Sequence, residues 1–151
     1  MTWSSIHHYD HLPASQPAHD LLSTQLLSEP VHLVAANRRV QGTEPIDLRE
    51  VAGHPWIAAP RSTACGEAVR HACHMAGFEP DVLITTSDFT LTAQLVAADH
   101  GLALLPELAI RTRADLVLRA LRHPYRRITQ FAARAGTYHH PNVQAVLTAV
   151  L

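Results

Sequence analysis

The stretch Leu95-Val96-Ala97-Ala98-Asp99-His100-Gly101-Leu102-Ala103-Leu104-Leu105-Pro106 joins the end of an expected helix to an expected strand. Apolar residues at helical spacing precede Gly101, and an unbroken apolar run from Leu102 to Leu105 follows it. A short apolar run that ends at a proline is typical of a strand buried on both faces. The stretch therefore predicts a helix that packs against a sheet.

The same alternation of strand and helix extends along most of the chain. The expected strands are residues 31–36, 56–59, 82–86, 102–105 and 128–133, and the expected helices are residues 65–76, 88–101 and a last one from Pro141. Residues 1–30 are rich in Pro, Ser and His and read as an extended lead-in. This order predicts an α/β fold with a mainly parallel sheet flanked by helices, in which ligands bind beyond the carboxyl ends of the strands.

Length and composition restrict the class of protein. The 151 residues suffice for one domain with a core, and 47% apolar with 17% charged residues argues against a disordered chain. The net charge is −1 and there is no basic run, so we expect this chain alone to bind nucleic acid poorly. The first twenty residues contain no apolar stretch that would act as a signal peptide or membrane span, and two cysteines fit a reducing compartment, so a cytoplasmic location is expected.

Five segments, in one order and spacing, resemble the effector-binding domain of LysR-type transcription regulators. They are Leu27-Ser28-Glu29-Pro30-Val31-His32-Leu33-Val34, Asp47-Leu48, Pro55-Trp56-Ile57, Ala76-Gly77-Phe78-Glu79-Pro80 and the stretch from Leu95 to Pro106. The resemblance covers about residues 20–151. It implies a two-lobed fold like that of the type 2 periplasmic binding proteins, with a small molecule held in the cleft between the lobes.

By this resemblance, residues 1–30 are a remnant of the first lobe and its lead-in, residues 31–124 are the complete second lobe, and residues 125–151 return to a partial first lobe. The family's helix-turn-helix and the opening of its first lobe have no counterpart in this sequence. We therefore expect no direct DNA contact from this chain and weak effector binding, or none, by the chain alone. We also expect an exposed sheet that seeks a partner, and therefore a homo-oligomer. The family usually has glycine where this chain has Asp99-His100, and we expect the turn to survive through Gly101.

The first candidate effector site is the loop that holds Arg61, Ser62 and Thr63. It follows a buried strand and precedes the clearest helix, so its hydroxyls and the free N–H groups of the helix would stabilise an anion there. Arg61 would add a bidentate contact to a carboxylate. In the family the matching loop faces the cleft and often contacts the effector. The alternative is that Ser62 or Thr63 only caps the helix.

The second candidate is Ser87-Asp88, which stands at the same kind of junction between a strand and a helix. The resemblance places these residues at the border of the cleft, from the same lobe. The acidic side chain of Asp88 opposes direct binding of an anion, so a plain N-cap is the favoured alternative.

Two further groups suggest other chemistry. The histidines, of which His7, His8 and His11 lie near Asp10 and His71 and His74 lie one helical turn apart, have no recognised ligand spacing, so no metal and no cofactor are expected. Cys65 and Cys73 resemble the reactive pair of the family's peroxide-sensing branch. On one helix they would be about 12 Å apart, and both fall on its apolar face, which favours a role in the core.

The resemblance thus implies a ligand-sensing domain. The absence of a Ser-His-Asp order, a P-loop and a GxGxxG motif argues against an enzyme. The expected partner is a small organic effector, plausibly a carboxylate, whose binding is coupled to transcription control. Two alternatives stay open: a solute-binding protein of transport, which shares the fold but needs a signal peptide, and a metal-dependent enzyme that uses the histidine-rich start.

Overall fold

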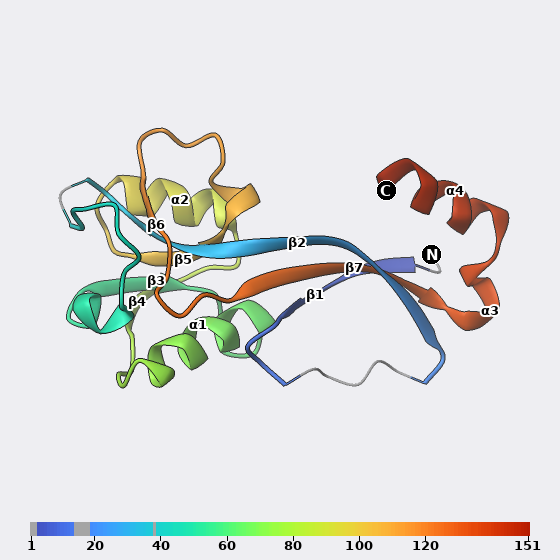
Figure 1. The fold of residues 1–151 in the computed structure, drawn as a ribbon, viewed down its shortest axis with the longest axis horizontal. Helices are drawn as coiled ribbons and strands as arrows, with labels where there is room; N and C mark the ends of the chain where they lie inside the picture. Colours follow the sequence, from blue (N-terminus) through green and yellow to red (C-terminus); the bar gives the residue numbers. More distant parts are fainter. Residues whose placement is uncertain (1–2, 14–18, 38) are drawn as a thin grey trace.

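The computed structural model describes residues 3–13, 19–37 and 39–151 of the chain. Its strands are β1 (Trp3–Tyr9), β2 (Leu21–Ala35), β3 (Pro55–Ala58), β4 (Asp81–Thr85), β5 (Ala103–Pro106), β6 (Val117–Arg119) and β7 (Arg126–Arg134). Its helices are α1 (Ala64–Met75), α2 (Phe89–Ala97), α3 (Ala135–Tyr138) and α4 (Pro141–Val150), with short 3-10 turns at η1 (Leu48–Val51) and η2 (Glu107–Ala109). One end of the elongated molecule holds β3, β4, α1 and α2, the other end holds α3 and α4, and the long strands β2 and β7 connect them (Figure 1).

The fifteen-residue strand β2 organises the sheet. Its first part pairs with β7, and its last part pairs with β5 on one side and β6 on the other, all antiparallel. Strand β1 pairs antiparallel with β7. The pair β3 and β4 is parallel, and single parallel bridges join Ile46 to Leu121 and Trp56 to Leu102. The second bridge connects the small parallel pair to β5.

The expected α/β content is present, but the expectation of a mainly parallel sheet was wrong. The apolar runs at β2 and β5 were interpreted as parallel strands because both faces are buried. Both faces are indeed covered by helices, but β2 runs on as one long strand, and the chain returns along it in the opposite direction. Residues 3–9 and 21–30 are also strands of a sheet rather than an unpaired lead-in. The part of that expectation that concerns residues 1–2 and 14–18 lies outside the described residues.

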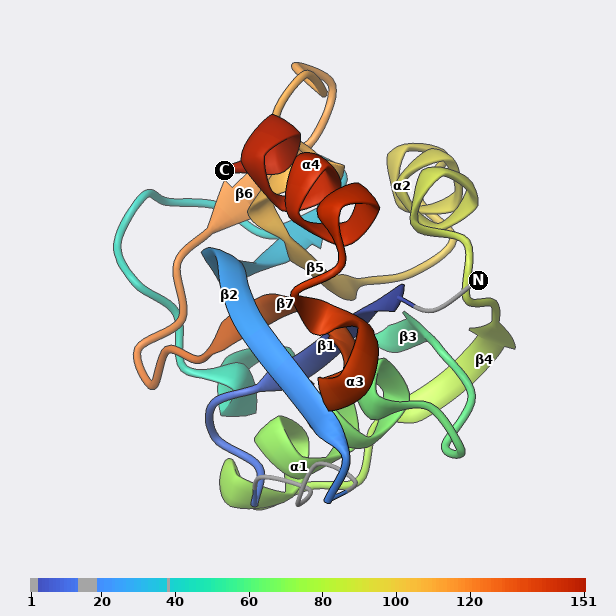
Figure 2. The ribbon, with the colours of Figure 1, turned by 90° about the vertical axis from the view of Figure 1, so that its right-hand side faces the viewer.

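Side chains alternate along β2 between two cores. Leu33 and its alternate neighbours pack on the side of α1, together with Trp56, Val69 and Cys73. Val34 faces the opposite side and packs with Ile57, Ala93 and Val96 beneath α2. This two-sided burial needs apolar residues at successive positions of the strand, which explains the unbroken run in the sequence. A third, smaller core lies at the other end, where α4 packs on β7 through Val143, Leu147 and Phe131. Figure 2 shows α3 and α4 at that end of the strands.

Glycine at two positions permits close backbone packing. A Cβ atom on Gly66, in the first turn of α1, would lie 2.1 Å from the carbonyl oxygen of Pro60. On Gly101 it would lie 2.9 Å from the carbonyl oxygen of Pro55. The turn between α2 and β5 does survive, but its left-handed residue is Asp99, with φ of 66°, while Gly101 lets the turn approach β3. The side chain of Arg39 contacts the Asp99 carboxylate and donates to its carbonyl at 2.9 Å.

Candidate functional site

The two predicted loops follow neighbouring strands. β3 and β4 are parallel, and the N–H of Thr86 donates to the carbonyl of Ala58 at 3.1 Å, so the chain segments that leave both strands start side by side. One leads into α1 and the other into α2. The N-terminal ends of these helices face the half of the molecule that contains α3 and α4 (Figure 2). The structure therefore gathers the predicted residues at one edge of the sheet.

The residues of the first loop have different environments. Arg61 is exposed and donates to Glu79 at 2.8 Å, and Glu79 also contacts His74. Contact with His74, and with Arg61, holds the pKa of the Glu79 carboxyl below its usual value. Ser62 is exposed. Thr63 is the N-cap of α1: its hydroxyl accepts from the N–H of Gly66 at 3.0 Å and donates to the carbonyl of Pro60 at 2.7 Å.

The second loop is also exposed at both predicted positions, Ser87 and Asp88. The carboxylate of Asp88 accepts from the N–H groups of Thr90 and Leu91 at 2.9 and 3.1 Å. Asp88 is thus the N-cap of α2, as the alternative interpretation predicted. The Asp88 carboxylate is thus committed to the helix amides, whereas the exposed hydroxyl of Ser87 can donate to a ligand.

A buried ion pair, which the sequence analysis missed, lies beside the start of α2. Glu29 on β2 is 3% exposed, and its carboxylate accepts from Arg127 on β7 at 3.1 Å and from the N–H of Leu108 at 2.9 Å. The Arg127 guanidinium also lies 5.4 Å from the ring centre of Phe89, the first residue of α2. Arg127 therefore connects the long strands to the helix start at which Ser87 and Asp88 lie.

Four titratable side chains of β1 and α1 are held in their neutral forms. Burial raises the pKa of the Tyr9 hydroxyl and of the Cys65 thiol, and it lowers the pKa of the His7 imidazole, which Arg127 lowers further. Burial raises the pKa of Cys73 to about 12. Both thiols therefore stay protonated at neutral pH, which favours the core role over a reactive pair.

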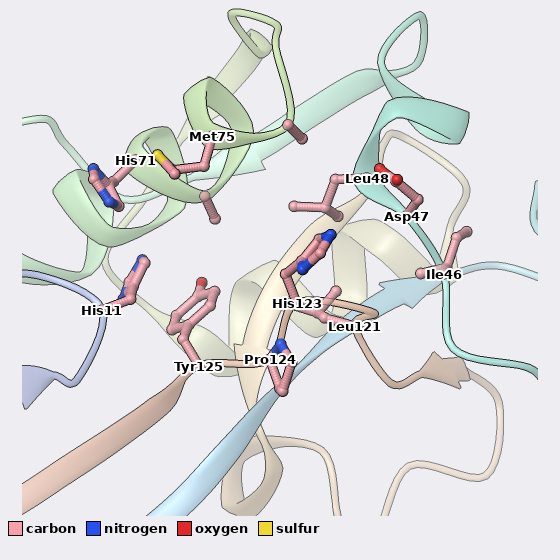
Figure 3. A pocket seen from close by; sticks show the side chains of 12 residues that line it. His11, Ile46, Asp47, Leu48, His71, Met75, Leu121, His123, Pro124 and Tyr125 are labelled. Carbon is pink, nitrogen blue, oxygen red and sulfur yellow. The ribbon is translucent and has the colours of Figure 1, made fainter.

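A cavity of about 350 Å³ lies at the far end of α1, between its last turns, η1 and the segment that leads into β7 (Figure 3). Most of its wall is apolar, with Leu48, Ala72 and Leu121 among the lining residues. Its polar lining residues are His11, His71, His123, Asp47 and Tyr125. They come from four separate segments of the chain, so no local motif in the sequence could have indicated this cavity.

A model of the LysR substrate binding domain matches residues 11–151 of the chain. The chain belongs to the LysR substrate-binding domain family. This match confirms the family that the sequence resembled. It begins ten residues from the start of the chain and therefore includes part of the segment that was interpreted as a lead-in.

Known proteins agree with this assignment. The LysR domain is 31% identical over 102 residues to the malonate utilization transcriptional regulator of Klebsiella pneumoniae. The aligned residues make up 66% of this chain and 33% of that regulator. The chain thus spans about a third of the length of this relative.

Two solved structures have the same fold at low identity. The regulatory domain of CcmR from Synechocystis, in complex with 2-PG, has a TM-score of 0.77 at 17% identity, covering 95% of this chain and 71% of that one. The effector-binding domain of QuiR in complex with shikimate has a TM-score of 0.74 at 18% identity, covering 91% and 67%.

The described residues of this LysR domain contain neither a clustered set of metal ligands nor a helix that could span a membrane. No group of three or more His, Cys, Asp or Glu residues among them is placed to hold a metal ion. His11 and His71 do lie together, with ring centres 5.1 Å apart, while His74 contacts Glu79 instead. No helix within the described ranges is long and apolar enough to span a membrane.

Proposed function

We propose that this LysR domain senses a small organic carboxylate that binds beyond the carboxyl ends of β3 and β4, and that this binding is coupled to transcription control. One observation carries the proposal: the loops that follow two neighbouring strands each start a helix, and both helix starts face the same half of the molecule. Helix N-termini favour anions because their N–H groups and dipoles present partial positive charge.

Arg61 is available for such a ligand. Its ion pair with Glu79 joins side chains that are 69% and 52% exposed, and exposed pairs of this kind contribute about 0–1 kcal/mol. An effector carboxylate therefore competes with Glu79 at little cost and gains a planar pair of donors. We propose Arg61, Ser62 and Ser87 as the effector-binding residues, with Thr63 and Asp88 as the caps that fix the two loops.

Related structures support a carboxylate as the effector. QuiR was solved with shikimate and CcmR with 2-PG, both bound to domains of this fold. No metal chemistry is needed for this function, and we propose no catalysis.

The long strands suggest how the domain is divided. We propose that residues 31–124 form the second lobe, and that residues 1–30 and 125–151 belong to a first lobe that is only partly present in this chain. Effector binding would then bias the arrangement of the lobes, and the signal would pass as a shift between populations. We further propose that the regulator acts as a homo-oligomer in the cytoplasm, and that any DNA contact is made by another part of the regulator.

Saturation-transfer NMR with shikimate, malonate and phosphoglycolate as probes tests the binding residues. We expect at least one probe to receive saturation from the wild-type chain, and the signal to fall by about tenfold in Arg61→Ala, since losing a charge-assisted contact costs on the order of 1–3 kcal/mol. Arg111→Ala, which removes an arginine that is equally exposed but lies far along the chain, should leave the signal unchanged. An equal loss in both variants, or no saturation with any probe at millimolar concentration, would contradict the proposal.

A further inference from the structure

We propose that the cavity at the C-terminal end of α1 is a second ligand site, which takes a monocyclic aromatic acid. The cavity is lined by His71, Ala72 and Met75, whereas the proposed effector loops adjoin the opposite end of the same helix. Ala64 and Ala72 are separated by about 12 Å along a helix with a rise of 1.5 Å per residue. The two sites therefore share a helix and no proposed binding residue.

The volume of the cavity suits a single ring with its substituent. A buried apolar cavity of about 150 Å³ is known to hold one benzene molecule, and ligand sites commonly start near 300 Å³. The present cavity measures about 350 Å³. Met75 lines the cavity and is 76% exposed, so it offers a ligand a flexible thioether, which contacts aromatic rings favourably.

Aromatic side chains form one end of the wall. The ring of His11 stacks on Tyr125 with centres 3.9 Å apart, and the ring of His71 meets His11 edge-on at 5.1 Å. Figure 3 shows these three rings on one side of the cavity and His123 on the other, beside Leu48. A flat ring placed between them would gain offset or edge contacts, which favour an aromatic ligand over an aliphatic one of equal volume.

One polar atom of this wall lacks a partner. The Nε2 atom of His11 bonds the carbonyl of Ala68 at 3.0 Å, which fixes a hydrogen on that nitrogen. The Nδ1 atom is buried and has no hydrogen-bond partner among the described residues. With its hydrogen on Nε2 and bonded to Ala68, the His11 ring cannot donate to a ligand oxygen, so the donors of this wall are the imidazoles of His71 and His123.

The charges around the cavity select an acid rather than an amine. Asp47 is the only carboxylate among the described lining residues, and both of its oxygens already accept from Arg49: Oδ1 from the backbone N–H at 3.0 Å and Oδ2 from the guanidinium at 2.8 Å. A second guanidinium, that of Arg122, lies 3.8 Å from the same carboxylate, and Glu50 is turned toward the N–H of Asp47. No carboxylate among the described lining residues is left to pair with a ligand cation, while the imidazoles of His71 and His123 can donate to a ligand oxygen.

Titration of the chain with benzoate, followed by nitrogen–proton correlation of the histidine rings, tests this proposal. We expect saturable shifts at His11, His71 and His123, and none at His7 or His139, which lie outside the cavity. Benzylamine, the matched cation, should bind about tenfold more weakly or not at all, because it finds no free carboxylate.

Two cavity-filling variants complete the test. Ala72→Leu and Ala76→Leu each extend a side chain into the cavity, so benzoate affinity should fall by about tenfold. Ala97→Leu makes the same enlargement at a half-buried position of α2 and should leave the affinity unchanged. If one of the two filling variants does not fold, the other variant and the histidine ring shifts still test the proposal. Absence of saturable shifts, equal affinity in the filled variants, or equal binding of benzylamine would overturn the proposal.

Discussion

Glu29 and Arg127 form the most buried ion pair of the described residues, with side chains that are 3% and 15% exposed. The pair exists because residues 29 and 127 lie opposite each other in the register of β2 and β7. Glu29 also accepts from the Leu108 N–H, and Arg127 lies over the Phe89 ring, so two residues tie the long strands to η2 and α2. Charges in such a position are stable only as a pair, since each alone would lack compensation.

Replacement of one partner should therefore cost more than replacement of both. We expect Arg127→Met to lower the free energy of unfolding by about 3 kcal/mol or more, because Glu29 stays buried without its partner. The double variant with Glu29→Leu should recover most of that loss. Urea unfolding of the single and double variants measures both effects.

Arg126→Met serves as the control, because Arg126 is the exposed neighbour on the same strand and bonds only Ser28 through its side chain. Its effect should stay within about 1 kcal/mol. Equal destabilisation by Arg126→Met and Arg127→Met would show that the ion pair has no special role.

At the scale of elements, the start of α1 links the proposed effector loop to the fold. Thr63 caps the helix through Gly66, and Gly66 lets the first turn lie against Pro60, so loop and helix are positioned together. The hydroxyl of Ser62 takes no part in this cap. The same loop thus contains one structural and one exposed hydroxyl in adjacent positions.

Removal of the two hydroxyls should therefore have different effects on stability. Thr63→Ala should lower the free energy of unfolding by about 1 kcal/mol, the usual cost of a lost N-cap. Ser62→Ala should change it by less than about 0.5 kcal/mol, since no bond of the cap is removed. Thermal unfolding of the two variants provides the comparison, and equal losses would mean that Ser62 shares the capping role.

The sequence predicted the helices well and the strands of the first third poorly. α1, α2 and α4 have apolar residues at helical spacing with a cap or proline at the start, signals that are local. β1 and the first half of β2 contain Ser4, Ser5, Ser23 and Gln25, and they are strands because β7 pairs with both. That pairing spans more than a hundred residues and leaves no local pattern.

The candidate site, too, could be predicted only in part from the sequence. Arg61, Ser62, Thr63, Ser87 and Asp88 could be singled out because each pair of strand and helix is adjacent in the sequence. Arg127 and the cavity at the end of α1 could not, because they depend on which distant segments meet.

At the scale of the whole molecule, β2 and β7 extend from the core between α1 and α2 to the end that contains α3 and α4 (Figure 1). The proposed effector edge lies between these two ends. A ligand that binds there contacts the starts of α1 and α2. Arg127, which lies over Phe89 at the start of α2, belongs to the strand that leads to α3 and α4. This arrangement gives effector binding a physical route to the relative arrangement of the two proposed lobes.

Mapping the backbone amide shifts of the chain during a titration with shikimate tests the central claim most directly. The account predicts that the largest shifts cluster at residues 61–66 and 87–91, the two loops and the helix turns that they start. Shifts confined to the cavity at the other end of α1, or no shifts at millimolar shikimate, malonate and phosphoglycolate, would contradict it.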